Sequence, residues 1–247
     1  MLKKYFKQIF IMIFLIFSVV LTAEDNFMAV GNIKIVRPEP LLIKREDLNI
    51  TIEKDSTIKV ESMYTFSNLG EYNIKSTFMF WLDQTRENDN KDPNNSNKNN
   101  KGKYIKNIKF YSDYKKSQNL RAVIKFDENI YENQSVGNIQ REWFAISKVI
   151  PSKEEGRLGV YYDLQNTGFN KTKKFVYSFD LVSNFSEKNK VEILYINVYN
   201  KSGRKIDSIV YKDYEFKNLT GKKSDKEHYE LLVANVNLDE KLVINFK

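Results

Sequence analysis

Apolar and polar residues alternate with a period of two through much of this chain. Leu48, Ile50 and Ile52, for example, are separated by single polar residues. Because successive side chains of a β-strand point to opposite faces, this alternation predicts strands with one buried face. The strands predicted in this way are 48–52, 58–66, 72–82, 120–126, 158–164 and 175–181. Three further strands are predicted at 206–211, 229–236 and 242–246.

Turn sequences separate several of these segments. Asn68-Leu69-Gly70 lies between 58–66 and 72–82, which predicts a hairpin with an aromatic inner face. Further turns are predicted at Asn166-Thr167-Gly168 and at Ser202-Gly203. Segment 191–199 is apolar on both faces, so we expect it to be a central strand. No long stripe has the helical period, and helix is predicted only as short turns within 148–155 and 115–118.

Closely spaced strands without intervening helices favour an all-β fold, and more specifically an antiparallel β-sandwich. Region 24–247 is long enough for one large domain or for two sandwich-like halves. The two halves would be 24–126 and 157–247, with 127–156 as their junction. Segment 83–103 contains seven Asn and almost no apolar residue, so we expect it to form a disordered surface loop.

The N-terminal residues have the features of a secretory signal peptide. Three lysines within the first seven residues precede an apolar run from Ile9 to Leu21, and a small residue, Ala23, follows. The apolar run is shorter than the roughly 20 residues that a membrane-spanning helix needs. We therefore expect cleavage after Ala23, export to the periplasm or the cell exterior, and no membrane span in the mature chain.

The charge and the rare residue types narrow the possible functions. The chain has 40 Lys and Arg against 32 Asp and Glu, and removing the three signal lysines lowers the net charge from +8 to +5. Opposite charges interleave, as in 222–227, so a nucleic-acid-binding surface is not expected. The absence of Cys excludes thiolate metal sites and a Cys nucleophile. His228 is the only imidazole, which excludes a site that needs two, and the chain has neither a Gly-X-Ser-X-Gly motif nor a phosphate-binding Gly motif. We therefore expect no catalytic site, cofactor or metal.

Several short motifs are spread along the chain. An acidic-Leu-X-Ile strand stands at 46–50, a Val-X-X-X-Tyr-X-Phe-X-Asn segment at 60–68, and Trp-Phe at 143–144, and Ile150-Pro151 and the Gly168 turn follow. Together these motifs resemble a family of exported bacterial proteins that is known only as a domain of unknown function, although Trp81-Leu82 replaces the Phe-Pro found in family members. The resemblance implies export and a β-rich fold, and it implies no catalytic residues.

Three functions of different class remain. We expect an exported, non-catalytic envelope protein that binds an unknown protein or glycan or acts as a scaffold. A carbohydrate-binding or carbohydrate-cleaving protein is the first alternative, and it would require Trp81 or Trp143 to lie exposed beside carboxylates as a ligand contact. A structural or adhesive surface component is the second alternative, and it would expose a long, unprotected strand edge. The carboxylates that could serve cleavage are Glu46, Asp47, Asp127, Glu128, Glu142, Glu154 and Glu155, which we interpret as solvated charges.

Overall fold

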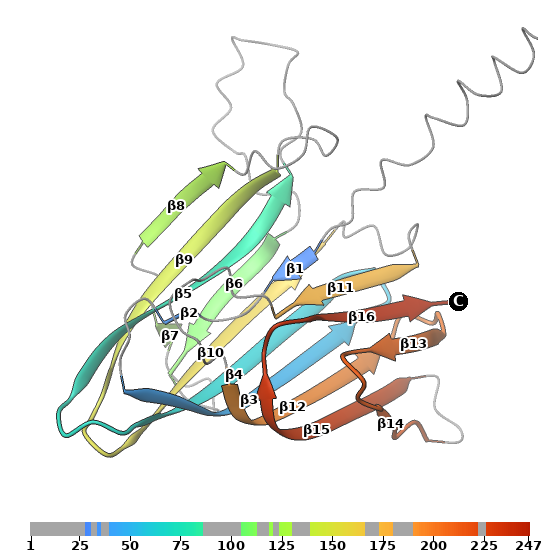
Figure 1. Cartoon of the computed structure of the whole chain (residues 1–247). Helices are drawn as coiled ribbons and strands as arrows, with labels where there is room; N and C mark the ends of the chain where they lie inside the picture. The colour runs from blue at the N-terminus through green and yellow to red at the C-terminus, as the bar shows by residue number, and fades with distance from the viewer. Residues whose placement is uncertain are drawn as a thin grey trace, which may run out of the picture.

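A computed structural model describes residues 28–30, 34–35, 40–85, 105–112, 119–120, 124–129, 139–165, 173–179, 190–221 and 226–247. Within these ranges the chain is all-β and contains no helix, which confirms the all-β part of the predicted fold (Figure 1). The signal peptide 1–23, the turn 166–168, the segment 115–118 and residues 86–103 of the predicted loop lie outside the described residues. Asp83 to Thr85, in contrast, continue a strand and do not belong to a loop.

Eight strands form the largest sheet, which we call the large sheet. Its order is β14-β15-β12-β3-β4-β10-β6-β7. The strands are β14 (Lys217–Asn218), β15 (Glu227–Asn237), β12 (Lys190–Asn200), β3 (Leu41–Ile52), β4 (Ile58–Asn68), β10 (Glu155–Leu164), β6 (Ile105–Tyr111) and β7 (Asn119–Leu120). The strand predicted to be central, β12, lies between β15 and β3, as expected from its apolar residues on both faces.

Two smaller sheets have four strands each. The β16 sheet has the order β1-β11-β16-β13, and the β9 sheet has the order β2-β5-β9-β8. The strands of the β16 sheet are β1 (Met28–Val30), β11 (Lys174–Ser178), β16 (Lys241–Phe246) and β13 (Ile206–Val210). Those of the β9 sheet are β2 (Lys34–Ile35), β5 (Ile74–Thr85), β9 (Ile139–Ile150) and β8 (Ile124–Asn129).

Strand pairing differs from the prediction in two respects. The sheets are mixed and not purely antiparallel, because β12 pairs with β3 in parallel and β1 pairs with β11 in parallel. The predicted hairpin between 58–66 and 72–82 is wrong, because β4 joins the large sheet and β5 joins the β9 sheet. Both strands were located correctly, but the turn between them carries the chain from one sheet to the other.

The chain passes between the large sheet and the β9 sheet twice, and the two connections lie side by side. β4 continues into β5 at the same corner where β9 continues into β10, so the pairs β4–β10 and β5–β9 extend one another across the bend (Figure 1). The Asn68 side-chain amide holds this corner, because it donates to Tyr72 O, Ile150 O and Pro151 O at 2.9, 3.0 and 3.0 Å. The helical turn predicted at 148–155 is therefore wrong, since these residues end β9, turn and begin β10.

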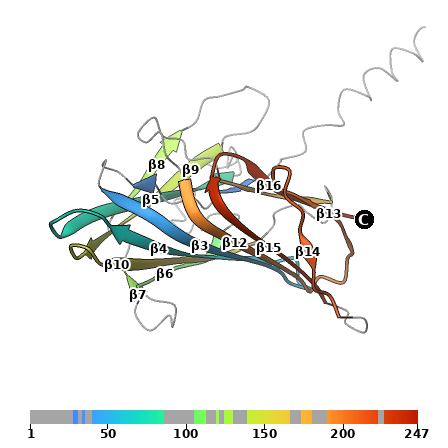
Figure 2. The same cartoon turned by 60° about the horizontal axis from the view of Figure 1, so that its bottom comes forward.

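The core lies between the large sheet and the two smaller sheets, which occupy the same side of it (Figure 2). Phe66 of β4 stacks on Phe78 of β5 with ring centroids 4.6 Å apart. Ser62 of β4 reaches Tyr177 of β11, with 3.3 Å between their hydroxyl oxygens. The buried face of every long strand of the large sheet is therefore turned toward the smaller sheets, and its opposite face is turned away from them.

Candidate functional site

The face of the large sheet turned away from the core, which we call the outer face, carries three rows of side chains. Each row crosses the six strands β15, β12, β3, β4, β10 and β6 in register. The rows are His228, Tyr199, Thr51, Lys59, Asp163, Asn107; then Glu230, Asn197, Asn49, Glu61, Tyr161, Lys109; then Leu232, Tyr195, Asp47, Met63, Gly159, Tyr111. Residues far apart in sequence thus form one polar and aromatic face, because alternate side chains of each strand point to the same side. Most of these side chains are at least partly exposed, whereas Asn197, Asp163, Met63 and Tyr111 are buried.

Tyr195 is held both at its hydroxyl group and against its ring. Its hydroxyl donates to Glu230 Oε2 at 2.8 Å, and the hydrogen bond to this carboxylate raises the pKa of Tyr195. The Arg45 guanidinium lies 5.7 Å from the ring centroid and donates from Nε to Asp47 Oδ1 at 2.8 Å. A partly exposed tyrosine is therefore fixed between a carboxylate and a guanidinium, and this reduces the entropy lost when a ligand contacts it.

His228 lies in the neighbouring part of the outer face. Its ring stacks on Tyr199 with centroids 4.4 Å apart and 18° between the planes, and Nε2 lies 3.0 Å from Asn197 Oδ1. His228 is half-buried on β15, which lies between β14 and β12. A ring that stacks on tyrosine and faces an amide oxygen suits contact with a ligand.

Tyr161, on β10 of the outer face, is a second tyrosine whose hydroxyl is held by a neighbouring carboxylate. Its hydroxyl donates to Asp163 Oδ1 at 2.6 Å, and Asn107 Nδ2 donates to Asp163 Oδ2 at 2.8 Å. Partial burial and the Asp163 carboxylate together raise the pKa of Tyr161. The outer face therefore presents tyrosine hydroxyls and carboxylates that are already hydrogen-bonded to one another.

The sequence candidates occupy different places. Trp81 and Trp143 are direct register partners on β5 and β9 of the β9 sheet, and their side chains lie outside what the structure describes. Of the candidate carboxylates, Asp47 lies on the outer face, whereas Glu46 is fully buried on the other face of β3. Glu154 and Glu155 are exposed at the corner. The sequence analysis missed Arg45, Asn197 and Glu230, because the register that brings them together spans distant strands.

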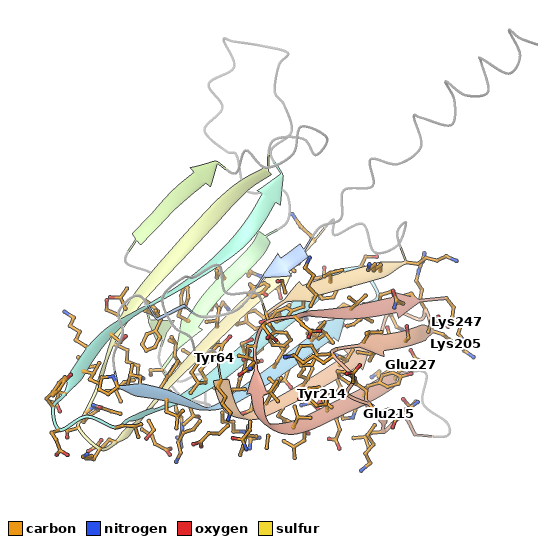
Figure 3. The ribbon with its side chains drawn as sticks, in the orientation of Figure 1. Tyr64, Lys205, Tyr214, Glu215, Glu227 and Lys247 are labelled. Atoms are coloured by element: carbon orange, nitrogen blue, oxygen red, sulfur yellow. The ribbon has the colours of Figure 1, made fainter. Side chains whose placement is uncertain are left out.

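A second polar group of residues, the interior polar cluster, lies between the layers. It consists of Glu46, Ser62, Tyr64, Tyr162, Tyr177 and Tyr211, and Figure 3 labels Tyr64. Burial raises the pKa of Glu46 to about 8, and the nearby Tyr64 hydroxyl opposes part of that shift. Neither Glu46 oxygen makes a hydrogen bond of standard geometry with the described protein atoms. Glu46 is therefore a carboxyl group that stays protonated at neutral pH in the folded chain.

Comparison with known proteins shows similarity in fold alone. No family model matches the chain, and no curated protein matches it. A candidate nutrient binding protein from Legionella pneumophila superposes with a TM-score of 0.57 at 9% identity, covering 88% of this chain and 70% of that protein. A candidate protease from Parabacteroides distasonis gives a TM-score of 0.43 at 6% identity over 84% and 40% of the two chains. An M1 zinc metallopeptidase from Deinococcus radiodurans gives 0.40 at 11% identity over 83% and 42%.

Two further observations concern the described residues. No group of three or more His, Cys, Asp or Glu side chains among them is arranged to hold a metal ion. None of their segments is a helix long and apolar enough to cross a membrane.

Proposed function

We propose that this chain is an exported, non-catalytic protein of the cell envelope that works as a binding or scaffold module. We also propose that its fold belongs to the β-sandwich class, with the β16 and β9 sheets together forming the second layer. The resemblance to exported proteins of unknown function and the signal-like N-terminus support export. The outer face of the large sheet is the proposed contact surface.

The observation that carries this proposal is the prearranged set of polar and aromatic side chains on the outer face. Tyr195, Tyr161 and His228 are each held by a neighbouring side chain, and Leu232, the register partner of Tyr195, is 63% exposed. Aromatic groups with polar partners and a nearby exposed apolar residue are typical of contact surfaces. Fixing them in advance favours binding, because less side-chain entropy is lost when a ligand is held.

A carbohydrate ligand is the alternative that the same surface favours. The Tyr195–Glu230 and Tyr161–Asp163 pairs combine ring faces with carboxylate acceptors, which suits stacking on a sugar and hydrogen bonding to its hydroxyls. A cleaving enzyme would in addition need two carboxylates across the scissile bond. Glucan or peptidoglycan hydrolysis that Glu230→Gln abolishes would overturn the non-catalytic proposal.

The test uses the mature chain, residues 24–247, as bait on envelope extract and on insoluble cell-wall polysaccharide. We expect one component to be retained and the Arg45→Ala, Tyr195→Ala double variant to retain at least ten times less of it, because the fixed tyrosine is lost. Tyr72→Ala is the matched control, since Tyr72 is 59% exposed in the loop between β4 and β5. Equal retention by all three proteins would exclude the outer face as the contact surface.

Export is tested separately by fractionating cells that express the full chain. We expect the protein in the periplasm or medium, with an N-terminus at Glu24. A cytoplasmic protein that keeps residues 1–23 would contradict the proposal.

A further inference from the structure

The long strand β15 is covered on one side and largely open on the other. β12 pairs with it from Glu227 to Asn237, whereas β14 pairs only with Tyr229 and Glu230. Among the described residues, no strand pairs with 231–237 on the β14 side. Figure 1 shows β15 at the front of the large sheet with β14 beside one end of it. We call residues 231–237 the open edge.

A hydrogen bond near the start of the open edge shows which of its backbone N–H and C=O groups point away from β12. Leu219 N donates to His228 O at 2.8 Å, so the backbone of His228 faces the β14 side. Backbone groups alternate between the two sides of a strand, and therefore those of Leu232 and Ala234 face the same side. Leu232 and Ala234 thus present two donors and two acceptors for an added strand.

The open edge is long for a sheet edge that carries no charge. Its sequence is Leu-Leu-Val-Ala-Asn-Val-Asn, with no charged residue and no Pro. Natural edges are usually kept short or carry charges, above all Lys, that disfavour pairing with another chain. The other edge strands follow this rule: β1, β2, β7 and β14 have two or three residues, and β8 and β13 carry Lys125, Asp127, Glu128 and Asp207.

We propose that two copies of this chain pair through their open edges, antiparallel and about a two-fold axis beside Val233. Leu232 of each copy then exchanges backbone hydrogen bonds with Ala234 of the other, and two sheets become one. The occupant is a second copy because residues 231–234 of the open edge are themselves extended and uncharged, so self-pairing opposes no like charges. The proposal does not rest on which ligand the outer face binds, although Leu232 belongs to both surfaces.

The local geometry allows this register. It places Asn235 of one copy opposite Leu231 of the other, next to the point where β14 begins. Asn235 has a φ of 56°, a left-handed conformation that bends a strand. The incoming strand therefore turns away before it meets β14. Exposed Leu232 and Ile193, 63% and 37% accessible, lie beside the edge and supply apolar contact area for the second copy.

Sedimentation of the mature chain over a range of concentrations tests the proposal. We expect a monomer–dimer equilibrium, weakened at least tenfold in Leu232→Lys and in Ala234→Pro. The Pro variant removes an N–H that faces away from β12, a position where edge strands tolerate Pro, and circular dichroism checks that both variants fold. Val210→Lys is the matched control, because Val210 is a 47% exposed residue at the end of β13, and its dimer affinity should equal that of the wild type.

A cysteine variant tests the register. The natural chain has no Cys, so Val233→Cys has a single thiol. Residues opposite one another in a non-hydrogen-bonded antiparallel pair have Cα atoms about 4.5 Å apart, within reach of a disulfide. We expect oxidised Val233→Cys to form a covalent dimer and Ser208→Cys on β13 to stay monomeric. A wild-type chain that sediments as a monomer throughout, or a dimer that Leu232→Lys and Ala234→Pro both leave intact, overturns the proposal.

Discussion

At the scale of single residues, Glu46 is the least expected feature of the core. It lies directly opposite Tyr64 in the β3–β4 register and is fully buried, and no lysine or arginine is among the groups that shift its pKa. The titratable groups that it influences across the core are Tyr64, Tyr162, Tyr177 and Tyr211, all of which have raised pKa values. A buried carboxyl without a cationic partner favours its neutral form.

Glu46 should make the stability of the fold depend on pH. The folded pKa of about 8 lies above the 4.5 of a solvated glutamate, so the folded state binds the proton more tightly than the unfolded state. This contribution is complete below pH 4.5 and is lost as the pH rises through 8, in total about 5 kcal/mol. Urea unfolding at pH 5, 7 and 9 measures it.

Glu46→Gln is the matched comparison for this measurement, because the amide keeps the shape of the side chain and does not ionise. The variant should lose most of the decline in stability between pH 5 and pH 9. The same decline in both proteins would show that Glu46 does not titrate in this range.

At the scale of the strands, the corner between the large sheet and the β9 sheet determines that β4 and β10 pair in one sheet and β5 and β9 in the other. Asn68 is 1% exposed, donates to carbonyls of both crossing segments and accepts from Gly70 N at 2.8 Å. Gly156 opens β10 beside it, where an added Cβ would lie 2.6 Å from Ile150 Cγ1. One amide and one missing side chain therefore allow two paired strands to bend together.

Asn68→Ala should destabilise the fold by about 2–4 kcal/mol, because several buried hydrogen bonds are lost and the carbonyls stay without a donor. Asn73→Ala is the control at the same corner, since exposed Asn73 only accepts from Ser152 N at 3.0 Å. We expect the control to cost less than about 1 kcal/mol. Equal losses in denaturant unfolding would contradict the role given to Asn68.

At the scale of the whole molecule, strands from distant parts of the chain share one sheet. β3 and β4, near the N-terminal end of the described chain, lie between β12 on one side and β10 on the other. The division into halves at 24–126 and 157–247 stays a prediction, but the strands of both proposed halves pair directly with one another. This arrangement favours a single folding unit.

A chain of residues 24–126 alone tests this arrangement. It lacks β10 and β12, so both outer edges of the β3–β4 pair would be open and their apolar side chains uncovered. We expect no cooperative thermal transition and poor dispersion of amide signals in NMR spectra. A folded, cooperative half would support two domains instead.

The local pattern of this chain was enough to predict an all-β fold, the place of most strands and a central position for β12. All of these follow from the geometry of a single strand, in which alternate side chains face opposite sides. That geometry is a property of neighbouring residues, and it can be read without knowing which strands meet.

The sheet to which each strand belongs, its register and the candidate site were determined by pairing between distant strands. The turn at Asn68 was recognised, yet whether β4 folds back on β5 or leaves for another sheet depends on contacts with Ile150 and Pro151, more than 80 residues away. The parallel β12–β3 pair, the burial of Glu46 and the rows of the outer face depend on register in the same way. Register is chosen by the free energy of the assembled layers, which no short segment contains.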